Sequence, residues 1–185
     1  NGQLKYERNY KNGIEYGKWI SYYKTGQLKY EKIYKNGLQD GNNFIYYQNG
    51  QIEQVATFVN GEKQGRWIYY FSNGQVWYEQ NYQYAIEHGK YIEYHQNGQI
   101  KSNGMYKIGK KDGLWLSYYQ NSKVMEEVNY KNGYYEGDNI TYYNNGEIKS
   151  KGYWINGKKH NLWAWYHKNG QLEEEVSYKD GEINW

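Results

Sequence analysis

Residues 49–72 read NGQIEQVATFVNGEKQGRWIYYFS, and this 24-residue pattern returns along the whole 185-residue chain without insertion or deletion. Three columns of glycine mark it, interrupted only by Ala85, Ser122 and Asn161, and Trp185 falls on the third column. The columns are Gly2, Gly26, Gly50, Gly74, Gly98, Gly146 and Gly170; Gly13, Gly37, Gly61, Gly109, Gly133, Gly157 and Gly181; and Gly17, Gly41, Gly65, Gly89, Gly113 and Gly137. A fixed period of this length is typical of stacked repeat proteins.

Counting from Asn1, the chain holds seven full repeats and a partial eighth, which we expect to form one repeat domain over 1–185. Their bounds are 1–24, 25–48, 49–72, 73–96, 97–120, 121–144, 145–168 and 169–185. A repeat supplies many similar places, whereas catalysis needs one special place. We therefore look for function in a surface that the repeats build together, or in a repeat that departs from the others.

Composition limits the class of protein. Mean hydropathy is −1.22, yet aromatic residues make up 21% of the chain, with 27 Tyr and 8 Trp, so Tyr is expected to form the core that a disordered chain lacks. The net charge of +3 and the interspersed Lys and Glu argue against a nucleic-acid-binding protein. With zero Cys, neither a disulfide nor a thiolate metal site is possible. No apolar stretch is long enough to span a membrane.

Each repeat reads as two β-strands. Asn-Gly stands at repeat positions 1 and 2 in six of eight repeats and at positions 12 and 13 in five, and both residues suit tight hairpin turns. We expect strands at positions 3–11 and 18–23, a short turn at positions 1–2 and a longer connection between positions 13 and 17. Together they predict an all-β fold, an elongated single-layer antiparallel β-hairpin array with a 24-residue period.

The two-residue period of a strand predicts which side chains share a face. Position 22 is always Tyr, position 20 is apolar, position 4 aliphatic and position 10 aromatic, and by parity we assign these four columns to the inward face. Positions 19 and 23 on the opposite side are also aromatic in most repeats. They form our candidate binding face: Trp19, Trp67, Tyr91, Trp115, Trp163, Tyr23, Tyr47, Phe71, His95, Tyr119, Tyr143 and His167.

Residues 17–37, GKWISYYKTGQLKYEKIYKNG, show the most intact form of the unit, and residues 113–133, GLWLSYYQNSKVMEEVNYKNG, a worn form. The unit resembles the MORN repeat, in the variant form found in bacterial YwqK-family antitoxins, and the resemblance spans the chain. It implies a twisted sheet of successive hairpins and a role in binding. Turn glycines are lost at Tyr84-Ala85, Asn121-Ser122 and His160-Asn161, where we expect either kinks or tolerated variation.

No catalytic or metal site is expected. His88 and His160 share position 16, and His95 and His167 share position 23, but each pair is three repeats apart, about 30 Å at the usual strand spacing. The Glu residues at position 7 recur beside Lys or Tyr, as on a solvated strand face. No phosphate-binding loop, nucleophile elbow or zinc-protease motif is present, so we predict a protein that is not an enzyme and has no cofactor.

Three functions stay open. The first is a scaffold for protein–protein interaction, of which neutralising a toxin is one form. The second is a carbohydrate- or cell-wall-binding module that uses the aromatic ladder, and the third is binding to a membrane surface, which the mild charge disfavours. End-to-end self-association through terminal strands is a further possibility. Because the chain starts at Asn1, we expect a segment of a longer protein. Its location stays open between the cytoplasm and the cell surface or the secreted fraction.

Overall fold

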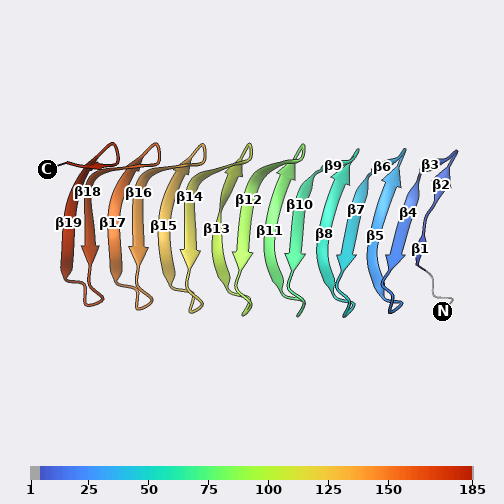
Figure 1. Ribbon diagram of the computed structural model, residues 1–185, viewed down its shortest axis with the longest axis horizontal. Helices are drawn as coiled ribbons and strands as arrows, with labels where there is room; N and C mark the ends of the chain where they lie inside the picture. Colours follow the sequence, from blue (N-terminus) through green and yellow to red (C-terminus); the bar gives the residue numbers. More distant parts are fainter. Residues whose placement is uncertain (1–4, 185) are drawn as a thin grey trace. The chain divides into compact units, whose positions relative to one another are not determined.

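Antiparallel hairpins follow one another along the chain in the computed structural model, which describes residues 5–184 (Figure 1). Gly2, Leu4 and Trp185, which the repeat columns include, lie outside the described residues. The described chain is all-β, as predicted, with no helix. It divides into an N-terminal unit, Asn1–His88, and a C-terminal unit, Gly89–Trp185. The single domain expected over 1–185 stays a prediction.

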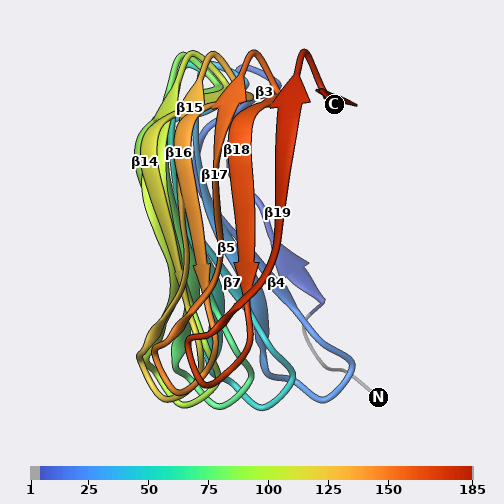
Figure 2. The same cartoon turned by 90° about the vertical axis from the view of Figure 1, so that its left-hand side faces the viewer.

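Each unit is built from neighbouring strands in sequence order. The strands of the N-terminal unit are β1 Tyr6–Glu7, β2 Tyr10–Lys11, β3 Ile14–Glu15, β4 Gly17–Tyr22, β5 Leu28–Lys35, β6 Leu38–Gln39, β7 Gly41–Tyr46, β8 Ile52–Val59, β9 Glu62–Lys63, β10 Gly65–Tyr70 and β11 Val76–Gln83. Strand β12, Ile86–Tyr94, contains the boundary. The C-terminal unit continues with β13 Ile100–Lys107, β14 Lys110–Tyr118, β15 Val124–Lys131, β16 Tyr134–Tyr142, β17 Ile148–Ile155, β18 Lys158–Tyr166, β19 Leu172–Lys179 and β20 Glu182–Ile183. In Figure 2 the strands β14–β19 form one layer.

Both connections are tight turns. Asn36 and Gly37 have φ angles of 51° and 80°, the pair of positive values that a two-residue hairpin turn requires. Strand pairing resumes at once, with Lys35 opposite Leu38. The expected longer connection at positions 13–17 is therefore wrong, because positions 14 and 15 pair with the preceding strand directly after the turn.

The turns survive where glycine is lost. Ala85, Ser122 and Asn161 keep positive φ angles of 61°, 63° and 60°. The amide of Ala85 donates to the carbonyl of Lys63 at 2.9 Å, just as Gly61 donates to Gln39 at 2.8 Å. Ala85 and Ser122 are thus tolerated variation within an unchanged turn, whereas Asn161 lies within β18, where the pairing with β17 is irregular between Lys151 and Tyr153.

A β-bulge in the first strand of repeats two to eight decides which side chains share a face. Ser21 pairs with Tyr30 but Tyr22 pairs with Leu28, so Lys29 is an extra residue. One extra residue reverses the alternation of the strand beyond it. Position 4 therefore stays on the face of positions 20 and 22, as predicted, whereas the assignment of position 10 to that face is wrong.

Position 10 lies instead with the position-19 side chains. Tyr34 is opposite Gly17, and its ring centroid is 4.7 Å from that of Trp19. We call this side the tryptophan face; it is made by the side chains at repeat positions 6, 8, 10, 15, 19 and 21. The opposite face carries positions 4, 7, 9, 18, 20 and 22, with surface ion pairs such as Lys18–Glu31 at 2.9 Å.

The tryptophan face holds most of the buried apolar side chains. Trp19, Trp67, Trp115 and Trp163 are only 3–6% exposed. Each indole Nε1 donates to the main-chain carbonyl at position 9 of its own repeat, as Trp115 does to Met105 at 3.2 Å. A Cβ built on Gly104, at position 8, would lie 2.2 Å from the Trp115 ring, and one on Gly152 would lie 2.1 Å from Trp163. The indole therefore rests directly on the backbone of position 8.

Position 8 varies with position 19 in a way that follows this geometry. Trp67, Trp115 and Trp163 share their repeats with Ala56, Gly104 and Gly152. The two repeats with Asn at position 19, Asn43 and Asn139, have the larger Lys32 and Val128 at position 8. In the repeat of Trp19, Arg8 places its guanidinium 4.8 Å from the centre of the indole ring. A single layer thus buries large rings by packing them against its own backbone.

We expect Gly104→Val to lower the free energy of unfolding by about 1–3 kcal/mol, since the new side chain overlaps the Trp115 ring. Adding Trp115→Asn recreates the Val128–Asn139 combination, so the double variant should recover at least about 1 kcal/mol relative to additivity. Urea unfolding of the four proteins measures this coupling. Gly104→Val combined with Trp163→Asn is the matched control and should be additive; equal coupling in both pairs would contradict the packing described.

Candidate binding face

The C-terminal unit carries an unbroken series of ring contacts along its tryptophan face. Ring centroids are 5.5 Å apart for Tyr91 and Trp115, 6.0 Å for Trp115 and Tyr130, and 4.8 Å for Tyr130 and Tyr135. The series continues from Tyr135 to Trp154, Trp163 and Trp165 at 5.0, 5.0 and 6.0 Å. Aromatic pairs at these separations stabilise beyond their buried area. The rings therefore serve first as the cohesive layer of the sheet.

Lysine side chains at position 15 lie over the position-19 indole rings in both units. The Nζ atoms of Lys63, Lys111 and Lys159 lie 4.6, 4.0 and 4.4 Å from the centroids of Trp67, Trp115 and Trp163. Burial lowers the pKa of Lys111, although Glu126 and Glu93 act in the opposite sense, and burial also lowers the pKa of Lys159. An ammonium group held over a ring face gains a cation–π interaction and closes that face.

The two repeats without an aromatic residue at position 19 differ from each other. Beside Asn139, position 15 is Tyr135, whose ring bridges Tyr130 and Trp154 and keeps the series continuous. Beside Asn43, position 15 is Gln39, which accepts a hydrogen bond from the Asn43 amide. No ring contact joins Tyr34 to Phe58 in the described part of the N-terminal unit.

A hollow of about 230 Å³ opens at this interruption. The residues that line it are Lys32, Gln39, Asn43, Ile45, Gln54, Ala56, Phe58 and Trp67. They come from the strands around Asn43 and from the following repeat, β8 to β10, so the hollow lies where neighbouring repeats place an indole. We call it the Asn43 notch.

The twelve predicted site residues form two separate groups and do not make one continuous aromatic face. The position-19 members, Trp19, Trp67, Tyr91, Trp115 and Trp163, lie on the tryptophan face and are largely covered. The position-23 members begin the hairpin turns: Tyr23, Tyr47, Phe71, His95, Tyr119, Tyr143 and His167. A binding role for either group stays a prediction.

The position-23 side chains connect consecutive repeats. The hydroxyl groups of Tyr23 and Tyr47 donate to the carbonyls of Tyr46 and Tyr70 at 2.6 and 2.7 Å, and Tyr119 and Tyr143 make the same bond to the next repeat. His95 Nε2 lies 3.0 Å from the Tyr118 carbonyl in the same way. Each contact crosses one repeat interface, so these five side chains add to the strand pairing between consecutive repeats.

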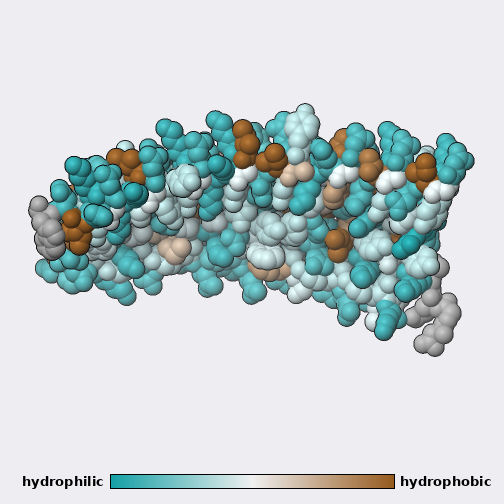
Figure 3. Space-filling model, turned by 45° about the horizontal axis from the view of Figure 1, so that its top comes forward, coloured by the Kyte–Doolittle hydropathy of each residue, from teal (hydrophilic) through white to brown (hydrophobic). Residues whose placement is uncertain are grey.

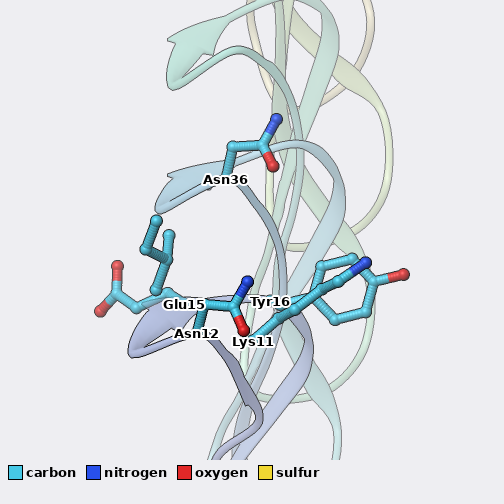
Figure 4. Close-up of a pocket in the computed structure, with 6 residues that line it drawn as sticks. Lys11, Asn12, Glu15, Tyr16 and Asn36 are labelled. Carbon is cyan, nitrogen blue, oxygen red and sulfur yellow. The ribbon is translucent and has the colours of Figure 1, made fainter.

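A second depression lies between the first two turns of the N-terminal unit. It has a volume of about 190 Å³ and is lined by Lys11, Asn12, Ile14, Glu15, Tyr16 and Asn36. Figure 4 shows Glu15 pointing away from Lys11 and Tyr16, so these side chains do not converge on a common point. Over residues 5–184, no three His, Asp or Glu side chains are grouped as metal ligands, and no helix is long and apolar enough to cross a membrane.

Sequence reasoning missed the position-10 rings, the position-15 lysines and the notch. The bulge was the cause, because strict alternation placed position 10 on the wrong face. One signal was available: a small residue at position 8 accompanies Trp at position 19 in three of four repeats, and larger residues accompany Asn. That correlation indicates contact between the two columns.

The tryptophan face predicts a pH dependence. Burial, with smaller contributions from Glu93 and Tyr106, raises the pKa of Tyr91 to about 12 from the ordinary 10.0. The folded state therefore holds this proton after the unfolded state has lost it, and we expect stability to decrease as pH rises from 10 to 12. Thermal unfolding across this range should show a shallower decrease for Tyr91→Phe than for the exposed control Tyr84→Phe. Equal slopes in both variants would contradict the assignment.

One family model, the MORN repeat variant, matches the chain at residues 1–12, 15–36, 39–60, 63–84, 87–107, 111–132, 135–156 and 159–180. No individually curated protein is significantly similar to it. MORN repeats are a non-catalytic type of repeat and generally serve as protein- or membrane-binding modules. With matches in all eight repeats and a hairpin array in both units, the chain belongs to the MORN repeat variant family.

Proposed function

We propose that the chain is a non-enzymatic scaffold that binds another protein through one edge of its N-terminal unit. The observation that carries this proposal is a row of apolar side chains at the turns, which we call the apolar turn row. Its members are 45–70% exposed: Ile14, Leu38, Val59, Tyr84 and Ile86. Figure 3 shows hydrophobic side chains along the edge formed by these turns. Exposed apolar patches of this kind mark interaction sites.

Consecutive turns lie close together at this edge. A Cβ built on Gly37 would lie 3.4 Å from the Ile14 side chain, and one on Gly61 would lie 3.4 Å from Leu38. Val59 and Tyr84 also line a depression of about 490 Å³ with Asn60, Glu62 and Gln64. Position 14 is Ile14, Leu38, Glu62 and Ile86 in the N-terminal unit but Lys110, Tyr134, Lys158 and Glu182 in the C-terminal unit, where Ile108 and Tyr134 are the exposed apolar side chains at the equivalent turns. Aliphatic residues at position 14 are therefore confined to the N-terminal unit.

The alternatives have less support. Carbohydrate binding needs open ring faces, but the four buried tryptophans are at most 6% exposed and lysines cover three of them. A membrane surface would meet Lys and Glu interspersed along the chain, with a net charge of only +3. The resemblance to YwqK-family antitoxins makes a toxin the first class of protein partner to test.

The test is stoichiometric co-purification of a partner from the native source, identified by mass spectrometry and repeated with Leu38→Lys plus Tyr84→Asn. Both substitutions use residues that other repeats carry at the same positions, so the fold should be kept. We expect at least a tenfold loss of the partner, since two large apolar contacts are removed.

The matched control is Ile108→Asn plus Lys110→Glu, which changes the same positions of the C-terminal unit and should leave the partner bound. Equal recovery with both variants would rule out the turn row. Binding to purified cell wall or flotation with anionic liposomes at physiological salt, without a protein partner, would favour the alternatives.

A further inference from the structure

We infer that the Asn43 notch is an anchor pocket for one flat aromatic side chain of the protein partner, next to an acidic residue in that partner. This inference rests on the proposed protein-binding function and names the chemistry that a second surface of the same unit would recognise. The notch lies on the tryptophan face, where the series of rings is interrupted, whereas the apolar turn row lies at the turns.

The shape of the notch comes from a missing ring. Neighbouring repeats fill this place with Trp19 and Trp67, which contact the position-10 rings on either side. At Asn43 the space of about 230 Å³ stays open between Phe58, Trp67 and Ala56. An aromatic side chain from outside would restore contacts of the kind that the sheet makes elsewhere.

The polar groups of the notch suit an aromatic side chain with an N–H or O–H group. Asn43 is only 3% exposed, and its own atoms are used: Oδ1 accepts from the Ile33 amide at 2.8 Å and Nδ2 donates to Gln39. Gln54 donates through Nε2 to the Tyr69 hydroxyl at 3.0 Å, which leaves its Oε1 as an acceptor toward the hollow. Tryptophan and tyrosine both supply the matching donor.

The charge of the notch favours an acidic neighbour. Lys32 is the one charged residue among those that line it, and its Nζ lies 5.1 Å from the Tyr30 ring. Lys63 extends over Trp67 and Tyr82 at 4.6 and 4.7 Å. Neither ammonium group makes an ion pair within residues 5–184. A carboxylate beside the inserted ring would pair with either lysine.

A sugar fits this site less well. Sugar rings stack on open aromatic faces, but Trp67 is 3% exposed and its Nε1 already donates to the Thr57 carbonyl at 3.1 Å. The notch therefore presents ring edges and small side chains, and it has no open indole face on which a sugar ring could stack. The corresponding place beside Asn139 is closed by the Tyr135 ring, so the C-terminal unit supplies a matched site without an opening.

The experiment uses the dipeptide Ac-Asp-Trp-NH2 as the probe and the side-chain amide NMR signals of Asn43, Gln39 and Gln54 as the readout. We expect saturable shifts with this probe, and at least tenfold weaker binding of Ac-Asp-Leu-NH2 and Ac-Lys-Trp-NH2. Absence of saturable shifts with Ac-Asp-Trp-NH2 would overturn the inference. Stronger shifts with N-acetylglucosamine would also overturn it and favour a carbohydrate site.

Asn43→Trp with Lys32→Ala closes the notch using the residue types found in the neighbouring Trp67–Ala56 repeat. We expect at least a tenfold loss of Ac-Asp-Trp-NH2 binding. Asn139→Trp with Val128→Gly is the matched control and should bind the probe as the parent chain does. Unchanged binding in the notch-filled variant would overturn the inference.

Lys32→Glu tests the charge without filling the space and remains informative if the filled variant does not fold. The Lys32→Glu variant should bind Ac-Lys-Trp-NH2 more tightly than Ac-Asp-Trp-NH2. An unchanged order of affinities would contradict the acidic neighbour.

The two proposals can fail independently of each other. Dipeptide binding without any protein partner would overturn the proposed function alone, whereas a captured partner that is unaffected by the notch-filled variant would overturn the anchor pocket alone.

Discussion

The contact between an indole ring and the bare backbone at position 8 is the interaction on which the rest of the structure depends. A single layer of strands has no second layer to cover its large rings. Trp115 and Trp163 solve this by lying flat on Gly104 and Gly152, where even one added carbon would come within about 2.2 Å. The indole N–H then donates to the main-chain carbonyl at position 9, as in Trp115 and Trp163. In the four repeats with Trp at position 19, one side chain thus achieves both burial and hydrogen bonding.

The same contact explains where the array has room for something else. When Trp is replaced by Asn, the amide still hydrogen-bonds the nearby backbone, as Asn43 does with Ile33, but the volume of the ring is lost. The C-terminal unit recovers that volume with Tyr135, and the N-terminal unit leaves it as the notch. An interruption of the repeat, not the repeat itself, therefore creates a distinct place on the surface.

Much of the fold was predictable because each signal was local. The Asn-Gly pairs indicated hairpin turns, and residues such as Asn36 and Gly37 adopt the positive φ angles that those turns require. The face of position 10 was not predictable by alternation, since the extra residue at Lys29 shows itself only in the pairing of Tyr22 with Leu28. The predicted ladder of positions 19 and 23 separates because position 19 lies within the second strand, whereas position 23 lies beyond its end and begins the turn.

By itself the sequence determined the 24-residue period, the all-β hairpin array and the MORN repeat variant family, because turn chemistry and repetition are properties of short segments. Only the tertiary structure decided which rings are covered, which lysines cover them and where the series of rings is interrupted. Those features depend on contacts across strands and between repeats. A one-residue bulge moves the side chains that follow it to the opposite face of the sheet, although the composition of the strand is unchanged.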